Sequence, residues 1–173
     1  MNEVIKAMKE RRSVRSFKPE HVPQETLEQI MEAGLYAASG MNRQSAILIS
    51  ITNEELRNKI SKANAAIMGI DKDPFYGAPD IIIVLADKSA PTYVYDGSLV
   101  MGNLMLAAHT LGVSSCWIHR AKEEFETEEF KALLKSLGIE GDYEGIGHCA
   151  LGYAADPVPE AKPRRIGRIF HIN

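Results

Sequence analysis

The stretch DIIIVLAD at residues 80–87 is the strongest strand signal in the chain. It is a continuous apolar run with an aspartate at each end and no polar residue between them. A short run that is apolar on both faces is typical of a strand buried inside a sheet, because a half-buried strand alternates apolar and polar residues. We therefore expect residues 80–87 to form a central strand around which the fold is arranged.

Further strands and helices are predicted on both sides of this strand. Short apolar runs predict strands at residues 46–52, 113–118 and 145–153, and a final strand at 168–172. Apolar residues at helical spacing predict helices at residues 4–8, 22–39, 54–68, 93–112 and 123–138. Taken alone, this alternation would suggest a parallel α/β sheet, although alternation does not fix strand direction.

The helix predicted at residues 93–112 is apolar nearly all round. A helix on the surface of a monomer needs only a one-sided apolar stripe. Two interpretations remain: the helix lies at the centre of the domain, or another subunit covers part of it.

Composition limits the function classes. A formal net charge of -3 over 173 residues gives no general bias toward nucleic acid or anionic membranes. Cys116 and Cys149 lack CxxC or Cys/His spacing, which argues against a disulfide scaffold and a zinc site. No apolar run approaches the ~20 residues of a membrane span. We interpret the chain as one domain, residues 1–173, of a soluble cytoplasmic protein, with a C-terminal tail from about residue 156.

Positive charge is concentrated in the stretch RRSVRSF at residues 11–17. The chain has neither a GxxxxGK[ST] nor a GxGxxG phosphate-binding motif, so side chains would have to hold any phosphate. Arginine guanidinium groups match phosphate oxygens, and Arg11, Arg12 and Arg15 supply three, with Ser13 as a neutral donor. Phe17 would anchor the segment. The alternative is a solvated cationic helix end.

The loop SGMNRQ at residues 39–44 carries two amides, Asn42 and Gln44. An amide offers a donor and an acceptor together, which suits a ring edge of alternating C=O and N–H groups. The alternative is a plain helix-ending turn with Gly40 near the C-cap. Trp117 and the two cysteines are typical core residues. Three other polar residues have no triad or metal-ligand context: Asp96, His119 and His148.

Six stretches together resemble the nitroreductase-like family of FMN-dependent oxidoreductases. They are RRSVRSF (11–17), AASGMNRQ (37–44), PFYGAPDIIIVLAD (74–87), LMLAAHTLGVSSCWI (104–118), CALGY (149–153) and KPRR (162–165). Their order and spacing carry the resemblance, which runs from about residue 4 to residue 165. It implies an α+β fold with a central mixed, largely antiparallel sheet flanked by helices. It also implies an intertwined homodimer with FMN at the subunit interface, in which the tail wraps the partner.

The resemblance also implies which residues contact FMN. Those assigned to the phosphate and ribityl chain are Arg11, Arg12, Ser13 and Arg15, with Arg15 also reaching the ring edge. Those packing on the flavin from the partner subunit are Ser39, Gly40, Met41, Asn42 and Gln44. Backbone N–H groups toward the flavin N5 and O4 come from Trp117 and Ile118, and Leu151 and Gly152 lie beside the cofactor. Late phosphate contacts come from Arg164 and Arg165, and weaker candidates are Asn64, Lys162 and residues 77–79.

The implied activity passes hydride from NADH or NADPH through flavin N5 to an electron-poor acceptor by a ping-pong mechanism. The acceptor classes are nitroaromatics, quinones and activated alkenes, and neither a catalytic side chain nor a metal is required. Two alternatives stay open: different flavin chemistry, such as dehalogenation, flavin fragmentation or heterocycle oxidation, and a non-catalytic phosphate or nucleic-acid binding module. One departure stands out, because the family's NxQPW reads NRQSA at residues 42–46 and lacks the proline and the tryptophan.

Overall fold

The computed structural model describes residues 1–172, and its sheet is built around strand β2 (Asp80–Asp87). The strand order is β1-β2-β4-β3, with β1 (Ala46–Ile51), β3 (Ser114–Ile118) and β4 (Tyr143–Gly152). All three pairings are antiparallel. The central position of residues 80–87 and the largely antiparallel, helix-flanked sheet are therefore confirmed.

The parallel direction that alternation alone would suggest is wrong, and the connection between β1 and β2 shows why. β1 ends at Ile51, which lies beside Ile81 near the start of β2. Helix α3 (Glu54–Met68) and the irregular residues 69–79 lie between the two strands. A helix alone would carry the chain to the opposite end of the sheet, as in a βαβ unit. Here the long return segment brings it back to the end that it left, so β2 runs antiparallel.

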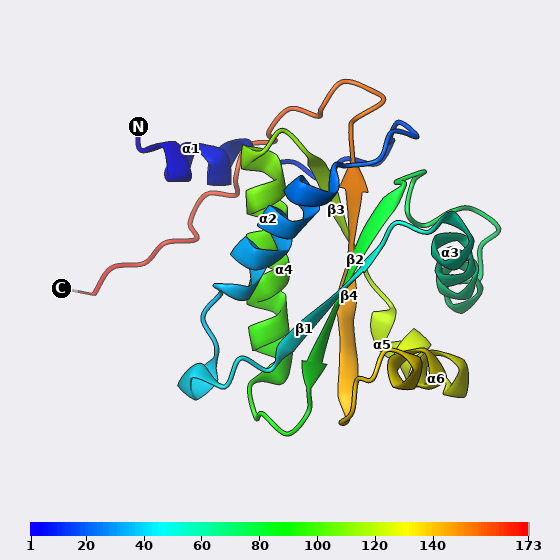
Figure 1. Cartoon of the computed structure of the whole chain (residues 1–173). Coiled ribbons are helices and arrows are strands. Elements are labelled where there is room, and N and C mark those ends of the chain that lie inside the picture. The colour runs from blue at the N-terminus through cyan, green and yellow to red at the C-terminus, as the bar shows by residue number, and fades with distance from the viewer. Residues whose placement is uncertain (173) are drawn as a thin grey trace.

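Two cores lie on the two faces of the sheet (Figure 1). Alternate residues of β2 enter each core, with Ile81 and Ile83 on one face and Ile82 and Val84 on the other. The first face is covered by α3, α5 (Ala121–Phe125) and α6 (Glu128–Ser136), and the second by α2 (Gln24–Leu35) and α4 (Tyr93–Thr110). Burial on both faces explains why this strand reads as a continuous apolar run.

Two predicted elements are corrected by the structure. The single helix predicted at residues 123–138 is two helices, because Thr127 leaves helical geometry and its hydroxyl caps α6 by accepting from the Phe130 N–H at 3.4 Å. The strand predicted at 168–172 is not formed within the described residues. Those residues are exposed and pair with no strand of their own chain.

Helix α4 lies partly in the core, as the first interpretation of its apolar sequence predicts. Val100, Met101 and Leu104 are buried against the sheet and α2, so one side of the helix lies in the core. Tyr95 and Leu99 on another side are 71% and 51% exposed. The short helix α1 (Glu3–Glu10) is similar, since only Ala7 is buried. Within residues 1–172, no helix is long and apolar enough to cross a membrane.

One histidine is fully buried among the side chains beneath α5. His148 on β4 lies with Nε2 2.7 Å from Oε2 of Glu124, and both side chains have no exposed surface. The pair lacks good hydrogen-bond alignment, and its remaining ring nitrogen and carboxylate oxygen have no partner among residues 1–172. The ring also packs on Phe75, with a centroid separation of 5.2 Å. His148 therefore has a structural environment in this core and lies away from solvent.

Asp73 organises the return segment that leads into β2. Its carboxylate accepts hydrogen bonds from the Phe75 and Gly77 N–H groups at 3.0 and 2.8 Å, and from Ser61 and the buried Arg57. Burial raises the pKa of Asp73, but these hydrogen bonds outweigh it and hold the pKa below its ordinary value. The charged form of Asp73 therefore stabilises the folded chain.

This network predicts an acid-sensitive contribution to stability. Because the folded pKa is lowered, the contribution is fully present above the unfolded pKa of about 3.9 and is lost as pH falls below it. We expect Asp73→Asn to lower the free energy of unfolding at pH 7 by about 1–3 kcal/mol. The loss should shrink as the pH approaches 3 in urea titrations of both proteins. An equal loss at pH 7 and pH 3 would contradict this assignment.

Candidate functional site

Residues 13–18 cross one end of the sheet and are fixed there by backbone hydrogen bonds. The Val14 N–H donates to the Ser115 carbonyl of β3 at 3.0 Å. The Lys18 N–H donates to the Tyr153 carbonyl, just after β4, at 2.8 Å. Ser13 forms an isolated parallel bridge with Ser115. The serine and arginines of RRSVRSF therefore lie where β3 begins and β4 ends.

Two of the arginines at this sheet end carry buried donors without partners. The Arg12 Nη1 donates to the Lys9 and Arg11 carbonyls at 2.6 and 2.7 Å. Arg11 Nη1 and Arg12 Nε are buried and have no hydrogen-bond partner among residues 1–172. Buried donors are normally paired, and a cationic donor is most costly to leave unpaired. The arrangement fits an anion with several acceptor oxygens, such as a phosphate.

The exposed Arg15 and the half-buried Ser13 belong to the same cluster. Burial raises the pKa of the Cys116 thiol, while the charge of Arg15, a hydrogen bond from Ser13 and the charge of Arg11 act in the opposite direction. Three of the four predicted phosphate-binding residues thus influence the Cys116 thiol on β3. Burial raises the pKa of Cys149 to about 12. Neither thiol is activated, in line with the prediction that both cysteines are core residues.

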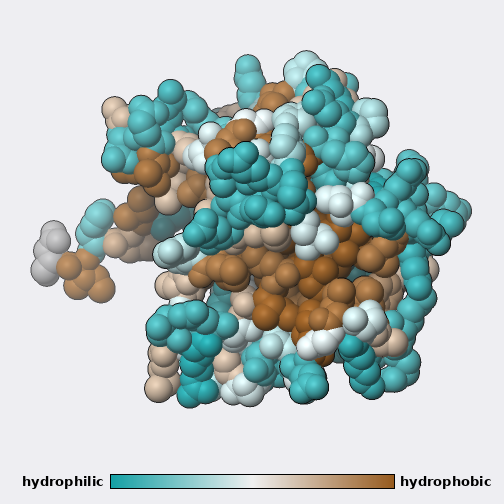
Figure 2. Space-filling model, viewed as in Figure 1, coloured by the Kyte–Doolittle hydropathy of each residue, from teal (hydrophilic) through white to brown (hydrophobic). Residues whose placement is uncertain are grey.

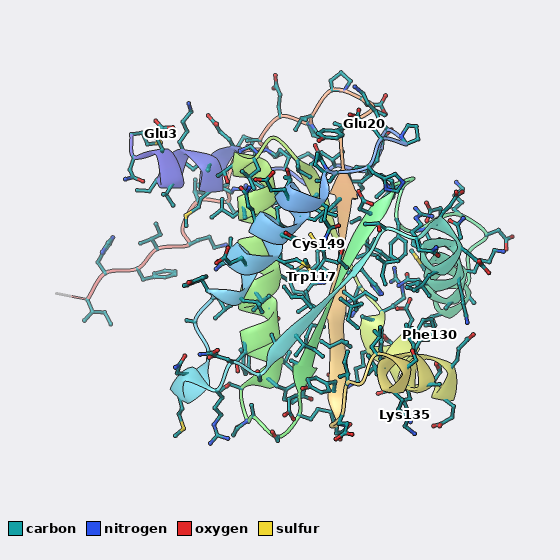
Figure 3. All side chains as sticks on the ribbon, viewed as in Figure 1. Glu3, Glu20, Trp117, Phe130, Lys135 and Cys149 are labelled. Carbon is teal, nitrogen blue, oxygen red and sulfur yellow. The ribbon has the colours of Figure 1, made fainter. Side chains whose placement is uncertain are left out.

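The predicted strand-end residues lie beside this cluster. Leu151 pairs with Ser115, and its side chain is fully buried, so only its backbone can face a ligand. The backbone of Gly152 lies close to Pro79 and Phe17. A Cβ there would lie 3.0 Å from Pro79 Cδ and 3.2 Å from Phe17 Cδ1. Ile118 is buried, whereas Trp117 is 36% exposed and pairs with Cys149 on β4 (Figure 3). The chain thus brings together four groups of predicted residues: 11–15, 77–79, 117–118 and 151–152.

The predicted loop at residues 39–44 lies elsewhere. Its Gly40 N–H donates to Asp96 Oδ1 at 3.0 Å, which places it at the first turn of α4. Helix α1, which leads into Arg11, packs at the other end of α4, near His109 and Thr110. With a rise of 1.5 Å per residue, the two ends are separated by roughly 20 Å along the helix. One chain does not bring the arginines and this loop into one site.

Two further sets of candidates differ in burial. Arg164 and Arg165 are exposed residues of the C-terminal tail. Asn64 is fully buried and already satisfied, because it donates to the His119 carbonyl at 2.8 Å and accepts from Arg120 Nε at 3.1 Å. Its side chain therefore holds the segment after β3 in place.

Asp96 has no site role in the prediction from the sequence, yet it contacts the predicted loop. This carboxylate is buried beneath the loop, and its signal in the sequence is its position as the only acidic residue within the apolar α4. Burial raises the pKa of Asp96, but hydrogen bonds from the Gly40 N–H, Ser45 and Thr92 outweigh it and hold the pKa below its ordinary value. Asp96 is thus a charged group at pH 7 that contacts the candidate loop directly.

One cavity is separate from the candidate site. It has a volume of about 660 Å³ and lies between α6 and the start of β4. Ion pairs of Lys88 with Asp142 and of Lys122 with Glu144 lie on its lining, and none of the candidate residues takes part. Within residues 1–172, no group of three or more His, Cys, Asp or Glu side chains is placed to hold a metal ion.

Comparison with known proteins defines the family. The profile of the nitroreductase family matches residues 8–74 and 66–153, and the chain belongs to this family. An Archaeoglobus fulgidus protein named as an NADH dehydrogenase/NAD(P)H nitroreductase is 30% identical over 161 residues, covering 90% of this chain and 88% of that protein.

Solved structures agree with this assignment. The structure of a nitroreductase with bound FMN from Bacteroides fragilis is 29% identical and covers all of both chains, with a TM-score of 0.90. An FMN-bound nitroreductase structure from Desulfitobacterium hafniense has the same identity and coverage, with a TM-score of 0.88.

The environment of Trp117 gives a prediction. A Cβ at Gly147 would lie 2.2 Å from the indole Nε1, so Gly147→Ala should displace the indole toward solvent. Since Trp117 is the single tryptophan, we expect its fluorescence emission to shift to longer wavelength. Gly102→Ala is the matched control, because nothing lies within 4 Å of a Cβ there. Identical emission from both variants and the unmodified protein would contradict this packing.

Proposed function

We propose that this protein is an FMN-dependent oxidoreductase that takes hydride from NADH or NADPH and passes it to an electron-poor acceptor by a ping-pong mechanism. The acceptor classes are nitroaromatics, quinones and activated alkenes. The observation that carries the proposal is the pair of buried, unpartnered guanidinium donors at Arg11 and Arg12. Family membership and the relatives' bound FMN identify the anion that these donors suit.

The residues at this end of the sheet bind different parts of FMN. Arg11, Arg12 and Ser13 bind the phosphate and ribityl chain, and Arg15 reaches the polar edge of the ring. The phosphate oxygens satisfy the unpartnered N–H groups, which removes the cost of burying them. Gly152 keeps the backbone free of a side chain at the close approach to Phe17. Lys162, Arg164 and Arg165 add phosphate contacts from the tail.

FMN, when bound, supplies the redox chemistry at its N5 position. The chain's own contribution is positional and electrostatic. β3 is an outer strand, so alternate N–H groups along it point away from β4, and those near Trp117 and Ile118 are assigned to the flavin edge. Such donors stabilise negative charge that develops on a bound ring. No side chain is required as a nucleophile or a metal ligand.

The chain acts as a homodimer in this proposal. Exposed apolar side chains gather on two projections from the body: Val4, Ile5 and Met8 on α1, and Ile166, Ile169, Phe170 and Ile172 on the tail. Figure 2 shows hydrophobic residues on both projections. A second copy would cover them together with Tyr95 and Leu99 of α4. The tail from about residue 156 would wrap this partner, as part of one domain over residues 1–173.

The dimer also explains how the two separated groups of site residues can bind one cofactor. The arginines and the loop at residues 39–44 lie at opposite ends of α4, so a second copy is needed to place one chain's loop against the other chain's arginines. We also propose a cytoplasmic location, which fits the two free, buried cysteines. Turnover of a panel of nitroaromatics, quinones and activated alkenes with each nicotinamide tests the acceptor class.

Charge reversal at Arg15 tests the phosphate and ring-edge assignment. Arg15 is exposed, so Arg15→Glu should leave the fold intact while placing a carboxylate beside the cofactor. We expect the FMN dissociation constant to rise at least about 30-fold, equal to about 2 kcal/mol. Flavin fluorescence titration at fixed ionic strength measures it. Lys62→Glu, the same charge reversal on the exposed surface of α3, is the control and should bind like the unmodified protein.

If Arg15→Glu binds FMN as tightly as Lys62→Glu, the assignment of residues 11–15 is wrong. If the unmodified protein produces no fluorescence change on FMN addition and purifies without flavin, the proposed function itself is wrong. The two results can be told apart. In the first the protein binds FMN, and in the second the unmodified protein does not.

Complementation tests the shared site. Asn42→Gly with Gln44→Gly removes both amides and keeps residues that tolerate the positive φ angles of 53° and 49° found there. Co-expression with Arg15→Glu should give heterodimers with one intact and one doubly damaged site. In a statistical mixture, about a quarter of all sites would then bind FMN. Arg15→Glu co-expressed with Arg12→Glu is the control, since both changes lie in one element and cannot complement.

Recovery in the first pair alone supports a site built from two chains. Equal failure in both pairs, with heterodimers demonstrated by differential tags, would place the whole FMN site within one chain.

A further inference from the structure

The loop at residues 39–45 holds an unusual backbone conformation. Three of its non-glycine residues, Met41, Asn42 and Gln44, have positive φ angles of 55°, 53° and 49°. Left-handed φ is unfavourable for residues with a Cβ and persists only where surrounding contacts enforce it. The side chains of this loop are mostly exposed, with Met41 at 87%. Packing of these side chains therefore does not enforce the conformation.

Hydrogen bonds within the loop are local. The Gln44 N–H donates to Ser39 Oγ at 3.0 Å, and Gln44 Nε2 donates to Asn42 Oδ1 at 3.1 Å. These contacts shape the loop but do not attach it to the body of the protein. The Asp87 N–H holds the end of the loop by donating to the Ser45 carbonyl at 2.9 Å. The remaining attachment comes from another group outside the loop.

Asp96 is that group. Its Oδ1 accepts from the Gly40 N–H at 3.0 Å, and its Oδ2 accepts from Ser45 Oγ at 2.8 Å and Thr92 Oγ1 at 3.1 Å. Two of the three donors lie at the two ends of the loop. The third, Thr92, lies immediately before α4, one turn before Asp96. The side chain is 3% exposed, and no cation is paired with it among residues 1–172. Loop and hydroxyl donors alone satisfy this buried carboxylate.

Gly40 makes the attachment close. A Cβ at Gly40 would lie 2.2 Å from Thr92 Oγ1 and 3.0 Å from its Cγ2, so the loop backbone rests directly on the start of α4. A donor N–H and a missing side chain at the same residue are both required for this contact.

We propose that Asp96 is a positioning residue that fixes residues 39–45 in the conformation that presents the Asn42 and Gln44 amides to the cofactor. The proposal rests on the proposed function, because it takes the loop to contact FMN. Asp96 itself does not touch the cofactor. It acts through Gly40 and Ser45, and in the dimer it therefore serves the site whose arginines belong to the other subunit.

The side chain at residue 45 takes part in this attachment. Ser45 is buried, and its hydroxyl donates to Asp96. The two ends of the loop are therefore bonded to the same carboxylate.

The test uses Asp96→Ala, with Asp96→Asn as the conservative variant and Ser98→Ala as the control. Ser98 lies on the same helix, and its hydroxyl bonds only to its own helix, at the Val94 carbonyl. The first readout is hydrogen exchange of residues 39–45 in the cofactor-free protein. The second is the FMN dissociation constant, and the third is the melting temperature.

We expect Asp96→Ala to accelerate exchange of the loop amides at least about 10-fold and to weaken FMN binding by a similar factor. Asp96→Asn should restore part of both, because its amide oxygen still accepts from the Gly40 N–H while the hydroxyls can turn to accept from its NH₂. Ser98→Ala should match the unmodified protein in both. A variant with a lower melting temperature but unchanged loop exchange and FMN affinity would overturn the proposal and leave Asp96 a structural residue only.

A second route covers failure of Asp96→Ala to fold. Gly40→Ala forces the loop off Thr92, and adding Thr92→Ala makes room for the new methyl group. We expect the single change to weaken FMN binding and the double change to recover part of it. Equal binding by the single variant and the unmodified protein would overturn the proposal. If the unmodified protein binds no FMN, the proposed function fails, whereas the exchange measurement on the cofactor-free chain still decides whether Asp96 holds the loop.

Discussion

The backbone hydrogen bonds that tie residues 13–18 to the end of the sheet are the constraint on which the candidate site depends. Val14 is bonded to β3, and Lys18 to the chain leaving β4. Since β3 and β4 are themselves paired, the segment cannot shift along one strand without losing bonds to the other. The attachment also positions the arginines, because Arg12 and Arg15 lie within two residues of the bonded Val14.

The length of α4 imposes the second constraint. An 18-residue helix separates the loop, which is attached at its first turn, from the arginine segment near its last turn. In the proposed function, a cofactor bound by both sets of residues would therefore contact both subunits of the dimer. The same helix supplies the core beneath and an exposed apolar side, so its nearly uniform apolar sequence serves the fold and the proposed interface together.

The sequence predicted what depends on local patterns. The buried β2 run and helix α3, with the predicted bounds at residues 54–68, both occur as predicted. Strand direction did not follow from the pattern, because it depends on the long return segment after α3. The break at Thr127 lies inside a sequence of good helix formers, so one capping hydroxyl decided it. For the site, the family resemblance supplied the residues and assigned the loop to the partner subunit, and the structure places the loop and the arginines at opposite ends of α4.

Asp96 shows why the remaining part of the site could not be predicted. Its partners Gly40 and Ser45 are more than 50 residues away in sequence, and no spacing motif connects them. A lone acid in an apolar helix is costly to bury unless donors converge on it, so its presence there implies a set of donors but not their identity. The backbone of the loop is the complementary feature. A loop that holds three left-handed φ angles with mostly exposed side chains needs an anchor elsewhere, and the buried carboxylate of α4 supplies it.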